Sequence, residues 1–343
     1  MEPNLAKVDW LEFVILVDNS IEWMSKMPPG YTSEVLGHLR NQPPIDPKLQ
    51  VPILDLDNYC CGAHGLAVLL RTHRDGQTYH TLFDTGPEGK SIARNLDSLK
   101  LDIRNVTRIV LSHWHRDHSG GILEVLKQRV AKQDDSTLPI TVDLHPNRPI
   151  ARGIAPPPTF DRVIARLPDD PTFEEIQECK GVVERHADAH TVQGDTVFVS
   201  GEIPRVAEWE KGLLGGMRWI QDAWKPEPDI LDERYVAVDV VGKGIIVFSA
   251  CSHAGICNVV LDVKKRFKDR PIHAVVGGLH LAGPELAQRI APTVKFLREN
   301  TGSSSVVLPL HCTGLAAKVA LANAFGEFCV PAGVGIQVRI PAA

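Results

Sequence analysis

The sequence lacks an apolar run long enough to cross a membrane, and it lacks a block of basic residues that would follow a nucleic-acid backbone. A bilayer span takes roughly 18 apolar residues, whereas the run at residues 13–17 has five. The densest basic stretch, VKKRFKDR at 263–270, has the pattern of a solvated helix face, and the formal net charge is −5. We therefore expect neither a membrane nor a nucleic acid as partner.

Signals for secretion and for serine hydrolysis are also missing. The run at residues 13–17 is flanked by acidic residues and is too short for the apolar core of a secretory signal. The seven cysteines are an odd number, which favours free thiols, and we expect Cys60 and Cys61 to pack without forming a disulfide. A cytoplasmic location is the expectation. The G-x-S-x-G turn of serine hydrolases does not occur.

What remains is an ordinary globular composition with alternating strand and helix patterns in two halves. The first half has strand patterns at 12–19, 64–73, 79–86 and 106–113, with helical patterns at 91–101 and 120–132. The second half has a hairpin at 234–253, strands at 272–280, 304–311 and 334–340, and helices near 256–268, 284–299 and 314–325. This order predicts an α/β fold in which two sheets pack face to face with helices outside, an αββα sandwich.

Two regions depart from this alternation. A stretch containing proline and glycine at 28–52 predicts a long irregular loop, and only one strand, at 195–201, is predicted within 146–235. We interpret residues 1–343 as a single domain in which 20–58 and 146–235 are elaborations.

The segment LSHWHRDHSGG at 111–121 carries the strongest chemical signal. Directly after a predicted buried strand it presents His113, His115, Asp117 and His118, and imidazole with carboxylate is a ligand set that suits zinc. In an extended segment His113 and His115 point the same way, so both can bind one ion, while Asp117 and His118 can reach a second. A histidine-rich surface loop without metal is the weaker interpretation.

Three later predicted strands also end in histidine, at His253, His280 and His311. Strand-end loops are where a sheet scaffold collects ligands from distant parts of a chain. We expect at least two of the three to be metal ligands, His253 and His311 ahead of His280. Beside them, Cys251 and Cys312 are either thiolate ligands or small buried apolar residues, and the second reading is favoured.

The HxHxDH pattern at 113–118 is the hallmark of the metallo-β-lactamase superfamily, and LFDTG at 82–86 resembles that superfamily's first motif. Further segments resemble one branch, that of 7,8-dihydropterin-6-yl-methyl-4-(β-D-ribofuranosyl)aminobenzene 5′-phosphate synthase. These are HGLAVLL (64–70), SGEIPR (200–205), CSHAGICN (251–258), GGLHL (277–281) and HCTG (311–314). The resemblance implies the αββα fold, a metal centre, and a supporting role for Asp84 behind the ligand loop. The usual PGHT-like histidine segment is missing.

The expected activity is that of a metal-dependent hydrolase in which zinc-bound hydroxide attacks a small ester, lactone, lactam or phosphoester. Asp117 would bind the metal and orient the hydroxide, and His64 is a candidate proton donor with a structural role as the alternative. One or two zinc ions are expected, with manganese or iron as alternatives. Iron-binding members of the fold carry glutamate where this chain has His115, which favours zinc over a redox enzyme.

Other functions stay open at this point. The branch resemblance makes a pterin-related synthase or transferase the alternative, and a metal-binding protein without turnover is another. Trp209, Trp219 and Trp224 are candidates for a substrate-pocket wall, although core packing is the preferred reading for each.

Overall fold

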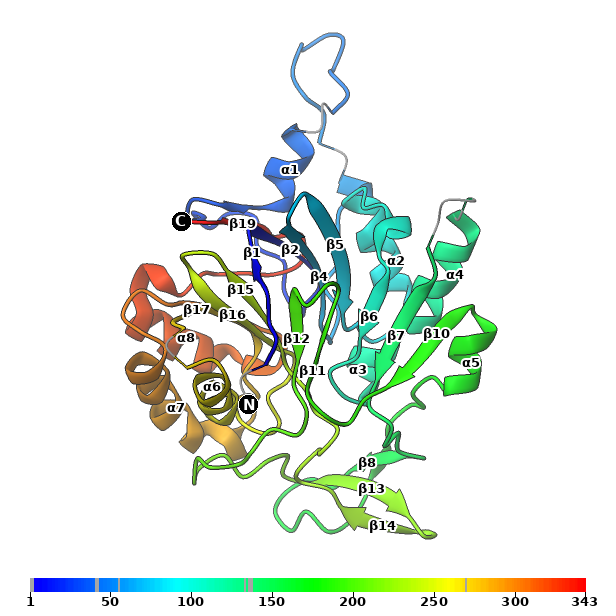
Figure 1. The fold of residues 1–343 in the computed structure, drawn as a ribbon, viewed down its shortest axis with the longest axis vertical. Coiled ribbons are helices and arrows are strands. Elements are labelled where there is room, and N and C mark those ends of the chain that lie inside the picture. The colour runs from blue at the N-terminus through cyan, green and yellow to red at the C-terminus, as the bar shows by residue number, and fades with distance from the viewer. Residues whose placement is uncertain (1–2, 41–42, 55, 133, 135–137, 269) are drawn as a thin grey trace.

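The computed structural model describes residues 3–40, 43–54, 56–132, 134, 138–268 and 270–343, and it has two large β-sheets packed face to face with helices on both outer faces (Figure 1). This confirms the predicted αββα sandwich. Among these residues, no helix combines the length and apolarity that crossing a membrane requires.

The first sheet has eight strands. In spatial order they are β10 (Gly181–Arg185), β7 (Ile140–Leu144), β6 (Arg108–Val110), β5 (Gln77–Phe83), β4 (Ala67–Arg74), β2 (Trp10–Val17), β19 (Gln337–Pro341) and β3 (Tyr31–Thr32). Its outer face is covered by α2 (Gly89–Ser98), α4 (Ile122–Lys132) and α5 (Phe173–Glu178).

The second sheet has seven strands. They are β11 (His190–Val192), β12 (Val197–Val199), β15 (Val236–Val240), β16 (Gly244–Ser249), β17 (Ile272–Gly278) and β18 (Val306–Leu310), with β1 (Lys7–Val8) beside β15. Its outer face is covered by α6 (Ile256–Arg266), α7 (Ala287–Asn300) and α8 (Leu315–Phe325).

A third, small sheet stands apart from the sandwich, at the lower end in Figure 1. Its strands are β14 (Ala223–Pro226), β13 (Gly216–Ile220), β8 (Arg152–Ile154) and β9 (Ala165–Arg166). The remaining short helices are α1 (Glu34–Arg40), α3 (Arg116–Ser119) and 3-10 turns at Leu56–Asn58, Ile103–Asn105, Pro284–Leu286, His311–Thr313 and Gly326–Phe328.

Strand alternation explains the two-sided core. Along β2, Leu11, Phe13 and Ile15 face the core between the sheets, while Val14 and Leu16 face the helices. Successive side chains of a strand point to opposite faces, so a strand buried on both faces is continuously apolar. This is why the apolar run in β2 is five residues long without being a membrane span or a helix.

Two predictions from the sequence are wrong. The stretch at 28–52 is not one irregular loop, because β3 pairs with β19 and α1 follows it. The region 146–235 holds far more than one strand: β10 and β12 are part of the two large sheets, and β8, β9, β13 and β14 form the small sheet. These strands have two to five residues, too few for periodicity to reveal them, and β8, β10 and β12 pair with distant segments of the chain.

Candidate metal centre

All the predicted ligands come from one edge of the sandwich, where parallel strands end. The strands β5, β6 and β7 are parallel to one another in the first sheet, as are β16, β17 and β18 in the second. His113 follows β6, and His253, His280 and His311 follow the three strands of the second sheet. Because the carboxyl ends of parallel strands share an edge, the fold brings these side chains together.

Three imidazoles form the first group. The Nε2 atom of His113 lies 2.9 Å from Nδ1 of His115, and Nε2 of His253 lies 3.2 and 3.1 Å from these two atoms. Two ligands of a tetrahedral zinc ion, each about 2.0–2.1 Å from the metal, lie roughly 3.3–3.4 Å apart. The triangle of nitrogens is therefore close to one face of a zinc tetrahedron.

The second group combines a carboxylate, two imidazoles and a thiol. Asp117 Oδ2 lies 3.6 Å from Nε2 of His118 and 3.3 Å from Nε2 of His311. The Sγ atom of Cys251 lies 3.1 Å from Nε2 of His118. The Nε2 atom of His311 is buried and has no hydrogen-bond partner among the described residues, as expected of an atom that faces a metal position. The donor set therefore fits a divalent cation.

The protonation states agree with this fit. Burial and neighbouring imidazoles hold the pKa of His113 and of His253 well below the usual range, and burial followed by Arg152 lowers the pKa of His115 to about 3. Neutral imidazole is the form that binds a metal. Burial also opposes the charge of His118, but Asp117 and Asp84 outweigh it and raise its pKa to about 9. A bound cation would take the place of that proton.

His280 and His64 occupy the border of these groups. The ring of His280 lies 4.4 Å from that of His253, and its Nδ1 atom is buried with no hydrogen-bond partner in the part of the chain that the structure describes. His280, His253 and Cys251 can also share a cation. His64 is largely exposed; its Nε2 atom lies 3.8 Å from Asp117 Oδ2 and its Nδ1 atom 3.1 Å from Asn19.

The comparisons with known proteins agree with this arrangement. Residues 63–204 match the family model of the metallo-beta-lactamase superfamily. The 7,8-dihydropterin-6-methyl-4-(beta-D-ribofuranosyl)-aminobenzene-5′-phosphate synthase of Methanocaldococcus jannaschii is 29% identical over 266 residues, which cover 77% of this chain and 85% of the relative. The crystal structure of the metallo-beta-lactamase fold protein YhfI from Bacillus subtilis aligns over 96% of this chain and 99% of its own, with a TM-score of 0.50 and 10% identity.

This chain has the metallo-β-lactamase fold, and its residues 63–204 are similar to the metallo-beta-lactamase superfamily. The synthase relative confirms the resemblance to that branch, while the YhfI structure, at 10% identity, bears on the fold alone.

Behind the centre of this metallo-β-lactamase fold, buried carboxylates hold the ligand loops by their backbone amides. Asp84 accepts hydrogen bonds from the amide and hydroxyl of Ser112 and lies 2.7 Å from Nδ1 of His118. Three further carboxylates each bond one loop. Asp232 accepts a hydrogen bond from the amide of Trp114, and Asp18 accepts one from the amide of His311. Glu233 accepts hydrogen bonds from the amides of His253 and Ala254. A carboxylate that accepts hydrogen bonds from backbone amides fixes the loop that carries them.

Of these four carboxylates, only Asp84 was identified from the sequence. Asp18 follows β2 as Asp84 follows β5, and both strands run toward the same edge, so the same strand-end signal was available for it. Asp232 and Glu233 lie in an irregular segment before β15 and carry no comparable pattern. Cys251, for which burial as an apolar residue was favoured, lies in the second ligand group.

Close backbone approaches and strained residues mark the same edge. A Cβ atom on Gly120 would lie 1.8 Å from the carbonyl oxygen of Pro87, so the turn after His118 requires glycine. Asp84, His280 and His311 adopt left-handed backbone conformations, with φ of 59°, 46° and 43°. Such strain costs of order 1–3 kcal/mol per residue and persists where the surrounding structure fixes it, often at functional sites.

A pocket with a volume of about 590 Å³ opens onto this centre. His115, Asp117, His253, His280 and His64 are among the residues that line it. The tryptophans considered from the sequence do not line it: Trp209 donates to Thr293 Oγ1, and Trp219 and Trp224 contact each other in the small sheet. In the structure each of these tryptophans makes packing contacts, which is the role that the sequence favours.

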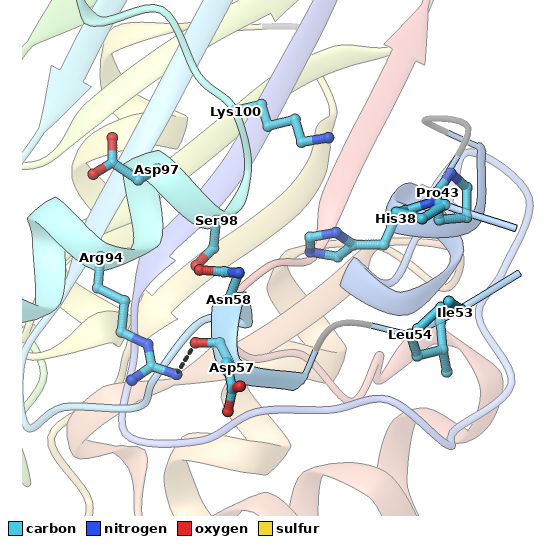
Figure 2. Close-up of a pocket in the computed structure, with 11 residues that line it drawn as sticks. His38, Pro43, Ile53, Leu54, Asp57, Asn58, Arg94, Asp97, Ser98 and Lys100 are labelled. Atoms are coloured by element: carbon cyan, nitrogen blue, oxygen red, sulfur yellow. Dashed lines mark hydrogen bonds between the residues drawn. The ribbon is translucent and has the colours of Figure 1, made fainter. Parts of the chain in front are cut away.

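Two other places on the molecule are less suited to binding a metal or a substrate. Asp143, His186 and His190 lie close together, but Arg234 and Arg108 already bond the Asp143 carboxylate, and two guanidinium groups disfavour a cation there. A second cavity of about 530 Å³ lies between α1 and α2 (Figure 2). Its polar groups serve the fold, since His38 contacts Glu34 and Arg94 donates to the carbonyl of Asp57.

Proposed function

We propose that this chain is a metal-dependent hydrolase that holds one or two zinc ions and acts on a small ester, lactone, lactam or phosphoester. The observation that carries the proposal is the pair of adjoining ligand groups at the floor of a pocket. His113, His115 and His253 would hold one ion, and Asp117, His118 and His311, with Cys251, a second. Zinc in such a site lowers the pKa of a bound water to near 7 and polarises a substrate oxygen.

The protein's own groups would position the reactants and move the proton. Asp117 is the only carboxylate of the two ligand groups, and its exposed side faces the pocket. It would accept a hydrogen bond from the attacking water and so orient it. His64, 3.8 Å from Asp117 at the rim, would return a proton to the leaving group. The buried imidazoles of His113 and His253 stay neutral and therefore serve as ligands only.

The alternative is a pterin-related synthase or transferase. It is favoured by the printed name of the archaeal relative, which shares 29% identity over 77% of this chain. Product analysis separates the two functions, because a hydrolase incorporates one oxygen atom of labelled water and needs no second organic substrate.

Zinc binding is the first expected result. The protein purified with zinc should hold one to two equivalents per chain, and removing the metal with a chelator should lower its free energy of unfolding. A ligand at a thousand times its Kd stabilises a protein by about 4 kcal/mol. Elemental analysis with thermal unfolding measures both. The test variant is His253→Ala, which removes a predicted ligand within the centre. Its matched control is His186→Ala, which removes a histidine outside the centre. No bound metal and no gain on reconstitution would reject the zinc assignment.

Turnover is the second expected result. We expect the zinc-loaded protein to hydrolyse at least one compound in a panel of lactones, lactams, carboxylic esters and phosphodiesters, and to lose this activity on chelation. Restoring zinc should restore it. The hydrolase proposal would be rejected if the zinc-free and zinc-loaded protein hydrolysed the compounds at equal rates, or if no compound of the panel was hydrolysed.

A further inference from the structure

The lining of the pocket over the metal centre combines two chemically different sets of residues. Besides the histidines and a few charged residues, most of it is aliphatic. The aliphatic residues are Ile154, Leu167, Leu213, Leu214, Met217 and Ile230. Ile154 and Leu214 are large side chains that stay 46% and 37% exposed. Apolar surface left open beside polar catalytic groups marks a ligand-binding surface.

This aliphatic wall comes from the small sheet and the segments next to it. Ile154 is in β8, Met217 is in β13, Leu167 follows β9, and Leu213 and Leu214 precede β13. None of these residues supports the ligand loops, so they are free to set which substrate enters.

The charged side chains next to the wall already form ion pairs and hydrogen bonds within the protein. Arg152 donates to Glu227 and Asp232, with N–O distances of 2.7 and 2.6 Å, and Arg218 also pairs with Glu227. Arg116 is the one other guanidinium among the described lining residues, and it donates to the carbonyl of Asp169. Those residues include no lysine. A phosphate group is bound by several cations or N–H donors, and this wall offers few of them.

From this division we infer that the substrate carries an uncharged alkyl or aryl group beside the bond that is cleaved, and that a phosphorylated substrate is disfavoured. The inference rests on the proposed hydrolase function. It names the substrate class as an ester or lactone with an apolar substituent, which the wall from Ile154 to Ile230 would cover while the carbonyl faces His115 and Asp117.

The first experiment measures hydrolysis along two homologous series, γ-lactones with side chains from methyl to hexyl and methyl esters from acetate to decanoate. Each methylene buried adds about 0.8 kcal/mol of transfer free energy. We therefore expect kcat/KM to rise roughly fourfold per methylene until the pocket is full. A binding series runs in parallel: the affinity of the zinc-loaded protein for acetate, butyrate, hexanoate and octanoate is measured by calorimetry, with phenyl phosphate as the phosphorylated comparator.

Variants assign the effect to the wall. Leu167→Ala and Leu213→Ala shorten two half-buried side chains of the pocket, and we expect each to reduce the preference for the longest substrate over the shortest roughly tenfold. Ile164→Ala and Ile220→Ala are the controls, because they shorten exposed isoleucines of the same region that do not line the pocket. Leu167→Ser is a second variant of the wall, should Leu213→Ala fold poorly.

The outcomes separate the inference from the proposed function. Turnover that is independent of chain length, or a preference for phenyl phosphate over octanoate, would overturn the inference and leave the hydrolase standing. Carboxylate affinity that rises with chain length and falls in the two wall variants, without turnover of any ester or lactone, would support the apolar wall and reject the hydrolase. Equal losses in the wall and control variants would also overturn the inference.

Discussion

Replacing Asp117 with alanine is expected to reduce kcat by roughly a thousandfold, while the fold persists. The Asp117 carboxylate lies within 3.3–3.8 Å of His311, His118 and His64, so it joins the second ligand group to the pocket rim. Metal-centre chemistry supplies several kcal/mol of transition-state stabilisation, and about 4 kcal/mol corresponds to a factor of a thousand in rate.

The fold should tolerate this change because the side chain of Asp117 is 25% exposed and the structural contact of the residue is made by its backbone, whose carbonyl accepts from Leu66. Steady-state kinetics, zinc content and circular dichroism measured together separate lost chemistry from lost structure. Asp169→Ala, an exposed carboxylate near the pocket, is the control. If Asp117→Ala keeps both its kcat and its zinc content, the carboxylate has no part in the reaction.

The sequence predicts the sandwich and its ligand edge because both depend on local patterns. Runs such as residues 13–17 and 244–249 are buried on both faces, and a histidine or aspartate that ends such a run lies at the strand edge by geometry. The small sheet follows no such rule. Its strands β8 and β9 have three and two residues, and they are stabilised by pairing across the sequence, which no local signal encodes.

The same reasoning explains which part of the candidate site could not be read from the sequence. His113 to His118 form a contiguous motif, whereas Glu233 reaches the His253 loop from 20 residues away and Asp18 reaches His311 from 293 residues away. The Asp18 contact is set by the packing of one sheet on the other, and the Glu233 contact by the pairing of β15 with β16 within the second sheet. The apolar wall of the pocket likewise depends on Leu213 and Ile154 meeting through the small sheet.

The supporting carboxylates offer a matched pair for a second large effect. Glu233 accepts the amides of His253 and Ala254 through separate oxygens, both at 2.7 Å. Glu210 does the same for the amides of Cys257 and Asn258, at 3.1 and 3.0 Å. Both carboxylates are buried, and burial raises the pKa of each, that of Glu233 to about 7. The two differ in what they hold: Glu233 holds a predicted ligand loop, and Glu210 holds the start of α6.

We expect Glu233→Gln to weaken zinc binding by about 10- to 100-fold, the usual effect of removing a group that orients a metal ligand. The glutamine NH2 group would face one of the two amides, leaving a buried donor unsatisfied at a cost of about 1–3 kcal/mol. Glu210→Gln should lose comparable stability, because it creates the same donor conflict, but it should retain zinc affinity. Chelator competition gives the zinc Kd, and urea unfolding of the zinc-free proteins gives the stability. If both variants lose zinc affinity to the same extent, Glu233 contributes to the stability of the whole sheet edge and does not position His253 specifically. Loss in Glu233→Gln alone would identify it as a positioning residue for His253.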